Sequence, residues 1–250
     1  MPGYFIDNDK IELSNNSDIV KIYFHPSSDK EVNITEAKRE YIAPIDHKPS
    51  IPLTKVTFYY LTPPNDVNIE KSISAVQDRY PGYPEHNRLE SVYNLEDESL
   101  KKSISTLIFP NSNLVSKPNF EKILSDNFYG VKFSTNSSTD YIISPKIKFV
   151  EVDTFSASGD FIWCRKKSDN VYSFFVESGT SFKQNGFGFE SDSPVTIYVK
   201  DSQGVIISKG AKLKLNGSNL SSASFDSSVK VISQSESHIE VELGSGTFKF

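Results

Sequence analysis

The chain has 250 residues, 37% of them hydrophobic and 24% charged, with a formal net charge of −5. This length suits one large domain or two smaller ones. An acidic chain lacks the positive field that attracts polyanions, so the composition argues against nucleic acid as the main partner.

From the sequence we expect neither a signal peptide nor a membrane-spanning segment. Cys164 is the only cysteine, so no disulfide within the chain is expected. The N-terminal segment MPGYFIDNDK has no basic region followed by an apolar core, and we expect no signal peptide. No apolar run approaches the roughly 20 residues that span a bilayer, so no membrane insertion is expected.

Residues 1–144 are predicted to form an α+β domain that begins with strands. Ile19–Phe24 (IVKIYF) and Lys55–Leu61 (KVTFYYL) are rich in β-branched and aromatic residues, which favour strands. Between them, Tyr41–Pro52 contains three prolines, and each proline fixes φ and removes a backbone donor. We therefore expect this segment to be an extended arm at an interface between subunits. Its marker residues are Tyr41, Pro44, Pro49 and Pro52.

Three helices are predicted in the same domain. The first begins at Asn68, the second lies within Asp97–Ile108, and the third runs from Pro118 to Gly130. Apolar residues recur at every third or fourth position in each segment, as on one face of a helix. These residues are Ile69, Ile73 and Val76; Leu100, Ile104, Leu107 and Ile108; and Phe120, Ile123 and Leu124.

Residues 145–250 are predicted to form an all-β antiparallel sandwich. Phe161–Cys164 and Tyr172–Val176 are expected to pair as a hairpin, and Val195–Lys200 is expected to pair with Val205–Ser208. Gly186-Phe187-Gly188 has no helix after it, so it is interpreted as a bend in a strand rather than a phosphate loop. A separate immunoglobulin-like unit starting near residue 191 is the alternative organisation.

An aromatic sheet face is the main candidate for ligand binding. Side chains two residues apart share a face of a strand, so Phe161 and Trp163 point the same way, as do Tyr172 and Phe174. Such a face would stack against sugar rings, which makes a surface glycan a candidate partner. The other interpretation, which we favour, is that these aromatic residues form the core.

The last segment, Gly204–Phe250, reads as short strands separated by turn residues. Leu213 and Leu215 alternate with lysines, and Ile239, Val241 and Leu243 alternate with glutamates. The Gly244-Ser245-Gly246 segment is predicted to be a turn. The runs KLKLNGSNL, VKVIS and HIEVELGSG resemble the IPT/TIG immunoglobulin-like domain, and this resemblance implies a sandwich fold.

No catalytic or metal-binding motif is found in the sequence. The four histidines are scattered and none has a second His or Cys at metal spacing. His86 and Glu90 lie four residues apart, but two ligands of common type are weak evidence, so no metal and no cofactor are expected. Cys164 lies in an aromatic strand, where a thiol usually behaves as a small buried apolar group. An enzyme whose site assembles from distant carboxylates is the least favoured alternative.

The sequence favours a structural or assembly protein rather than an enzyme. Serine-rich and asparagine-rich sandwich modules with proline arms look similar to accessory proteins of tailed bacteriophage particles, such as tail, baseplate or head-decoration components. The expected partners are other structural proteins or copies of the chain itself, and the expected location is a virion, or the cytoplasm during assembly.

Overall fold

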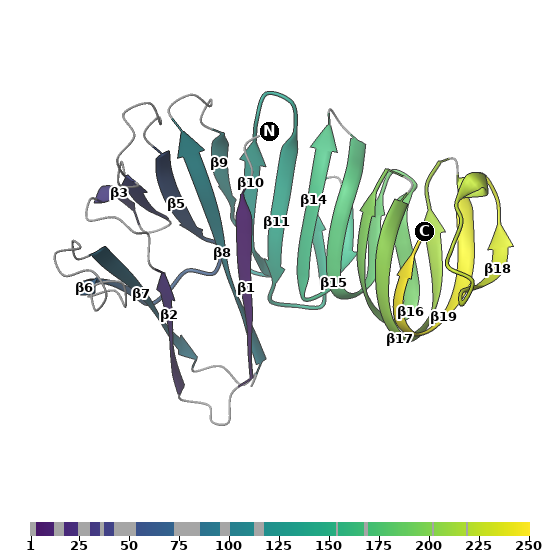
Figure 1. The fold of residues 1–250 in the computed structure, drawn as a ribbon, viewed down its shortest axis with the longest axis horizontal. Helices are drawn as coiled ribbons and strands as arrows, with labels where there is room; N and C mark the ends of the chain where they lie inside the picture. Colours follow the sequence, from purple (N-terminus) through teal and green to yellow (C-terminus); the bar gives the residue numbers. More distant parts are fainter. Residues whose placement is uncertain are drawn as a thin grey trace, which may run out of the picture. The chain divides into compact units, whose positions relative to one another are not determined.

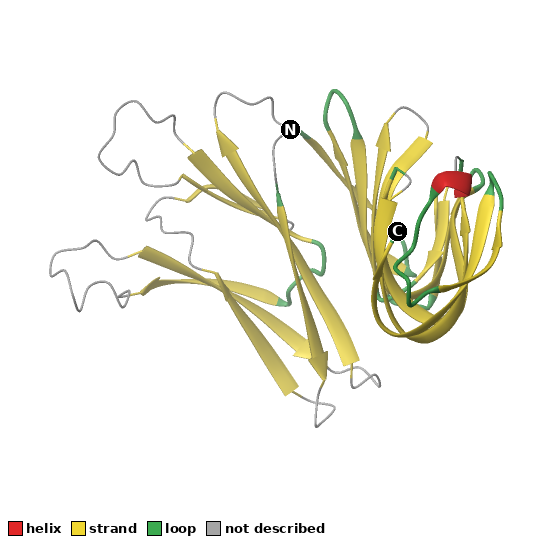
Figure 2. Cartoon of the chain, turned by 45° about the vertical axis from the view of Figure 1, so that its right-hand side comes forward, coloured by secondary structure: helices red, strands yellow, loops and turns green. Residues whose placement is uncertain are grey.

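The computed structural model describes residues 4–12, 18–24, 31–35, 38–42, 54–72, 86–95, 101–112, 118–153, 155–167, 170–201, 203–218 and 220–250. The chain divides into two compact units, Met1–Lys117 (unit 1) and Pro118–Phe250 (unit 2). Antiparallel strands build both units, and the helical element among the described residues is one short 3-10 turn, η1 (Leu220–Ser222) (Figure 1, Figure 2). The predicted α+β class of the N-terminal region is therefore wrong, because its described residues are all-β.

The described residues of unit 1 form two antiparallel sheets. One has the strand order β1-β8-β5-β4-β3 and the other β2-β7-β6. Residues from both sheets share one apolar cluster, in which Phe58 of β5 packs with Leu89 of β7 and the rings of Phe24 and Phe58 lie 5.0 Å apart. The strands are β1 (Phe5–Glu12), β2 (Asp18–Phe24), β3 (Glu31–Thr35), β4 (Lys38–Ile42), β5 (Thr54–Tyr60), β6 (Asp66–Ser72), β7 (His86–Leu95) and β8 (Lys101–Ser112).

The second predicted helix is strand β8. This strand is paired along both edges, with β1 and with β5, and side chains on both of its faces are buried, as the adjacent residues Thr106 and Leu107 show. Its β-branched residues Ile104, Thr106 and Ile108 alternate along the strand. Such side chains are crowded on a helix but fit a pleated sheet, which explains why the helical spacing was misleading.

The other two predicted helices also correspond to strands. The first begins in β6, and residues 73–85 lie outside the described residues. The third is split into β9 (Asn119–Ile123) and β10 (Phe128–Ser134). Between them the N–H of Asn127 donates to Ser125 Oγ at 3.1 Å. Side chains of this kind bond the local backbone in turns and so compete with helix formation.

Unit 2 is an eleven-stranded antiparallel sheet that bends over itself. Its main path is β18-β19-β17-β16-β15-β14-β11-β10-β9, and β12 and β13 join it through β15. The remaining strands are β11 (Thr139–Pro145), β12 (Phe149–Val152), β13 (Phe155–Ser158), β14 (Phe161–Lys167), β15 (Asn170–Gln184), β16 (Phe187–Lys200), β17 (Gln203–Asn216), β18 (Lys230–Gln234) and β19 (His238–Lys249). The unit boundary at residue 117 precedes the boundary expected at residue 144, and the β10–β11 hairpin spans the expected one.

Four long strands, β15, β16, β17 and β19, contribute to both layers of unit 2. The first half of β15 pairs with β14, whereas its second half pairs with β13. The pairing register shifts around Gly179 of β15 and again between Ser191 and Thr196 of β16. We call the layer containing β9, β10, β11 and β14 layer I, and the layer containing β12, β13 and β18 layer II. Strands that change layer through bulges are a known way to build such corners.

The core of unit 2 lies between the two layers. Phe174 and Phe182 come from opposite halves of β15, and their rings stack with centroids 4.4 Å apart and planes 11° apart. Strands from residue 187 onward contribute Phe189, Ile197 and Leu213 to the same core, so unit 2 is continuous across residue 191.

Both hairpins predicted in unit 2 are confirmed. Cys164 pairs with Phe174 between β14 and β15, and Tyr198 pairs with Val205 between β16 and β17. At the predicted bend Gly186-Phe187-Gly188, Gly186 instead lies in a hairpin turn, and Phe187 and Gly188 begin β16. Asn185 and Gly186 have φ values of 47° and 80°, as in a two-residue type I′ turn.

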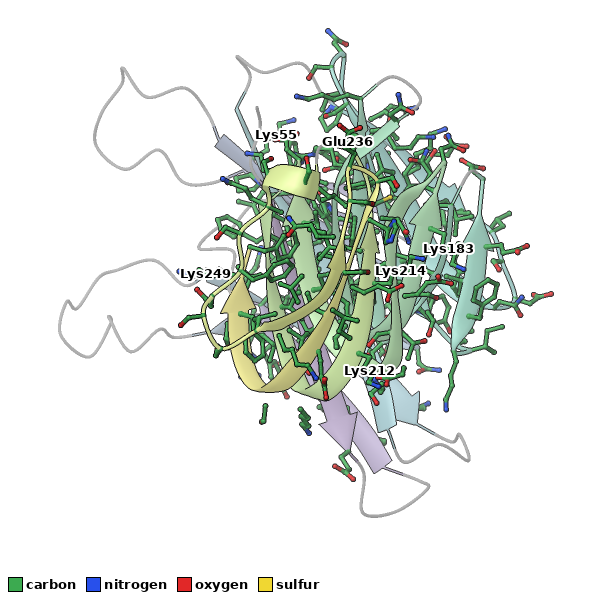
Figure 3. All side chains as sticks on the ribbon, turned by 90° about the vertical axis from the view of Figure 1, so that its right-hand side faces the viewer. Lys55, Lys183, Lys212, Lys214, Glu236 and Lys249 are labelled. Atoms are coloured by element: carbon green, nitrogen blue, oxygen red, sulfur yellow. The ribbon has the colours of Figure 1, made fainter. Side chains whose placement is uncertain are left out.

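The outer surface of layer II is charged. Lys214 lies 3.7 Å from Glu240, Lys230 lies 2.8 Å from Glu242, and Lys183 pairs with Glu190. Figure 3 labels Lys183 and Lys214 on this side of unit 2. The alternation of lysine and glutamate across neighbouring strands keeps this face in contact with water.

Candidate functional site

The four aromatic residues predicted to bind a ligand do not share one face. Phe161 and Trp163 point to the side of layer I that faces away from the core, as alternation predicts, but Phe161 is buried and Trp163 is only partly exposed. Phe174 pairs with Cys164, and both side chains are fully buried in the core between the layers. The Tyr172 side chain lies outside the described ones. Phe174 is therefore a core residue, whereas Trp163 belongs to the outer surface.

Two aromatic residues outside the four predicted binding residues lie beside Trp163. Phe175 of β15 is the cross-strand partner of both Trp163 on β14 and Tyr198 on β16. The rings of Trp163 and Tyr198 lie 6.5 Å apart with planes 29° apart, and the Phe161 ring lies 6.3 Å from that of Phe175. We call Trp163, Phe175 and Tyr198 the aromatic row.

Polar side chains form the neighbouring row on the same face. The Arg165 guanidinium donates from Nε and Nη2 to the two carboxylate oxygens of Asp140, both at 2.5 Å, and lies 5.4 Å from the Trp163 ring centroid. Ser173 is the cross-strand neighbour of Arg165 and of Lys200. Because the carboxylate of Asp140 is buried, it holds the guanidinium in a fixed orientation above the aromatic row.

The predicted interface arm lies largely outside the described residues. Pro44, Pro49 and Pro52 are not described. The backbone of Tyr41 lies in β4 and pairs with Val56 of β5, so the start of the predicted arm is part of a sheet. The expectation that the rest of this segment is an extended arm stays a prediction.

Exposed apolar side chains among the described residues lie mainly on or beside strands that end a sheet. These residues are Phe5 on β1, Ile19 and Tyr23 on β2, Ile69 on β6, Leu124 after β9, Ile147 and Phe149 at β12, and Val231 and Ile232 on β18. Tyr198 and Ile207 lie instead on the outer face of layer I. An edge strand presents unpaired N–H and C=O groups, so apolar residues at an edge make it suited to pairing with another chain.

Glu90 is the centre of a polar cluster on the three-stranded sheet of unit 1. Its carboxylate accepts hydrogen bonds from Tyr23 Oη at 2.7 Å, from Asn68 Nδ2 at 3.2 Å and from Lys21 Nζ at 3.2 Å. The hydrogen bond from Tyr23, followed by that from Asn68, lowers the pKa of Glu90 below its ordinary value. Because these partners come from β2 and β6 on either side of β7, the carboxylate joins all three strands.

The buried acidic residues among the described ones each bond to a basic side chain. Glu90 is bonded to Lys21, and Asp140 is bonded to Arg165. The described residues contain no group of three His, Cys, Asp or Glu side chains able to hold a metal ion. Burial raises the pKa of the Cys164 thiol far above its ordinary value, which keeps the thiol neutral and unreactive.

Within the described part of the chain, no helix is long and apolar enough to cross a membrane. The described residues form antiparallel sheets with apolar edges and an aromatic outer face. The chain matches no protein-family model and no curated protein. The three runs that resemble an IPT/TIG domain form β17, β18 and β19, which are neighbours in the sheet, and the resemblance stays a prediction.

Proposed function

We propose that the protein is a non-enzymatic structural or assembly component that works through contacts of its sheet edges. The neighbours in these contacts are copies of the chain itself or other structural proteins. The observation that carries the proposal is the placement of exposed apolar side chains at sheet edges. Natural monomers usually protect such edges with charges, prolines or bulges, so apolar edges favour association.

The clearest edge is β12. This strand pairs only with β13 among the described strands, and its register with β13 is regular. Phe149 at its start is 48% exposed, and Ile147 two residues earlier is 49% exposed. At the other end of layer II, β18 carries a register shift beside Ile232, and a bulge of this kind partly protects an edge. We therefore place the main contact at β12.

A tailed-bacteriophage virion, with the chain as a tail, baseplate or head-decoration protein, is the setting that we propose. This finer assignment is supported only by the composition of the sequence and its sandwich modules. The edge contacts themselves require no particular particle.

Light scattering across a concentration series tests the proposal. We expect the chain to form a defined oligomer, and we expect Phe149→Lys to raise the concentration needed for assembly by about tenfold or more, because a charge would be buried in the contact. Ile207→Lys is the matched control, since it places the same charge on an exposed apolar position of an interior strand. A chain that stays monomeric throughout, or an oligomer equally weakened by both variants, would contradict edge-mediated self-assembly.

A further inference from the structure

The aromatic row is built so that two of its rings converge. Neighbouring strands lie about 4.8 Å apart, so Trp163 and Tyr198, which are two strands apart, start from backbones about 10 Å apart. Their ring centroids are only 6.5 Å apart. The two rings therefore lean toward each other over Phe175, the residue between them. This arrangement makes a continuous aromatic surface rather than three separate side chains.

The surface is accessible at its Tyr198 end. Tyr198 is 38% exposed, and Ile207 on the adjacent strand is 51% exposed. Trp163 and Phe175 are partly exposed. In contrast, the large rings on the inner face of β15, Phe174 and Phe182, have no exposed surface.

A buried hydroxyl beside this surface has no hydrogen-bond partner among the described residues. Ser173 lies two residues before Phe175, on the same face of β15, and only 2% of it is exposed. Its Oγ makes no hydrogen bond to any part of the chain that the structure describes. A buried polar group without a partner costs free energy, so structures rarely keep one without a reason. A polar ligand lying on the aromatic row would supply the missing partner.

Charged groups flank the hydroxyl on both sides. Arg165 and Lys200 are its cross-strand neighbours on β14 and β16. Asp140 fixes the planar guanidinium of Arg165 through two hydrogen bonds, so the group is preorganised. The face thus offers an apolar surface bordered by a row of hydrogen-bonding groups.

We propose that this face binds a carbohydrate. The C–H groups on one side of a pyranose ring pack against an aromatic surface, while its hydroxyls project from the rim toward polar groups. The aromatic row would hold the sugar ring, and Ser173, Arg165 and Lys200 would bond its hydroxyls. The chain has a net charge of −5, which favours a neutral sugar over a single-stranded nucleic acid, the other common ligand of stacked aromatic residues. This site uses a sheet face and does not depend on the edge contacts.

The test begins with the full chain on a glycan array carrying oligosaccharides that end in glucose, galactose, mannose or N-acetylglucosamine. A fluorescent oligothymidine serves as the nucleic-acid probe. Oligosaccharides that bind are then titrated by calorimetry against Tyr198→Ala and Ser173→Ala, with Phe149→Ala as a control for an exposed aromatic residue elsewhere. We expect each of the first two variants to weaken binding by about tenfold, and the control to leave it unchanged.

Ser173→Ala separates a binding role from a structural one. Removing an unpartnered buried hydroxyl is expected to leave the melting temperature unchanged or to raise it, while sugar affinity falls. The same variant should assemble like the wild type in light scattering, so the two proposals fail independently. Binding to no sugar, preferential binding to oligothymidine, or sugar binding that neither Tyr198→Ala nor Ser173→Ala weakens would each overturn the proposed site.

Discussion

The contact between Phe174 and Phe182 depends on a bend in β15, so measuring this contact tests the bend. These residues are eight positions apart on one strand, so their Cα atoms would lie about 27 Å apart if the strand were straight. Their ring centroids are instead 4.4 Å apart, and both side chains are fully buried. The contact therefore exists only if the strand turns back near Gly179 and places its two halves in opposite layers.

A double-mutant cycle measures this contact. Replacing either ring by alanine is expected to lower the free energy of unfolding by about 3–5 kcal/mol, and two such losses approach the whole stability of a domain. Leucine variants are therefore more suitable, with an expected loss of about 1–2 kcal/mol each. Stacked aromatic pairs contribute about 0.5–1.5 kcal/mol beyond their burial. The double variant Phe174→Leu/Phe182→Leu should thus lose about 1 kcal/mol less than the sum of the single losses.

Urea unfolding followed by tryptophan fluorescence is the assay. Trp163 is the only tryptophan of the chain and lies in unit 2, so its signal reports the unfolding of that unit. Phe149→Leu is the control, because this exposed ring should change stability by no more than about 0.5 kcal/mol. A coupling energy below about 0.3 kcal/mol would refute the folded-over sheet, since distant sites add within that error.

Three further predictions concern single residues. Gly179→Ala should destabilise unit 2 by about 1–3 kcal/mol in urea unfolding, because a Cβ there would clash with the carbonyl oxygen of Ser158. Gly244→Ala, with open space around it, should cost less than about 1 kcal/mol. Cys164 should not react with a thiol reagent at pH 8 until urea unfolds the chain, because burial raises its pKa; rapid reaction of the native protein would contradict this. The pKa of Glu90 lies below its ordinary value of 4.5, mainly because of the hydrogen bond from Tyr23. The stability that this carboxylate contributes is therefore present above pH 4.5 and is lost as the pH falls through the folded-state pKa. Glu90→Gln should therefore flatten the acid limb of the stability profile, and an unchanged acid limb would argue against this linkage.

The strands of unit 2 were predictable because many of them have one buried face and one solvent-exposed face. In β17, Leu213 and Leu215 are buried and the lysines beside them lie on the outer surface, so the alternation in the sequence records the fold directly. The turn at Asn185-Gly186 also carries a strong local signal, since Asn-Gly is the preferred pair for a type I′ turn. That signal identifies the β15–β16 hairpin without any knowledge of the structure.

The helices were mispredicted because a strand covered on both faces has no clear period of two. In β8, Ile104 and Leu107 are buried on opposite faces, and together with Leu100 and Ile108 they reproduce helical spacing by coincidence. The better signal is the side-chain type. Ser103–Phe109 (SISTLIF) contains three β-branched residues and two serines, which favour a strand over a helix interior.

The candidate binding face was only partly predictable, because alternation separates two faces without telling which one is the core. Phe174 and Phe175 are adjacent aromatic residues, and nothing in the sequence indicates which of the two side chains is on the surface. Their burial differs because β15 bends toward the side on which Phe174 points, and this bend encloses Phe174 together with Phe182. The bend depends on where β13 and β14 pair along β15, and such long-range pairing leaves no local signature. Similarly, Gly244-Ser245-Gly246 has turn composition but lies within β19, at the level where that strand changes layer.

The two proposed roles of unit 2, assembly and ligand binding, use different surface groups. The outer face of layer II is crossed by lysine–glutamate pairs, such as Lys214 with Glu240, and these groups would have to lose their hydration in any close contact. Apolar surface is left at the edges, as at Phe149, and on the outer face of layer I around Tyr198. An edge strand offers unpaired backbone groups that can pair with another strand. On the outer face of layer I the backbone groups are already paired within the sheet, so only side chains are left to contact a ligand. Under the two proposals we therefore expect a strand-forming partner at the edge and a small polar ligand on the face, so substitutions at the two positions should affect different partners.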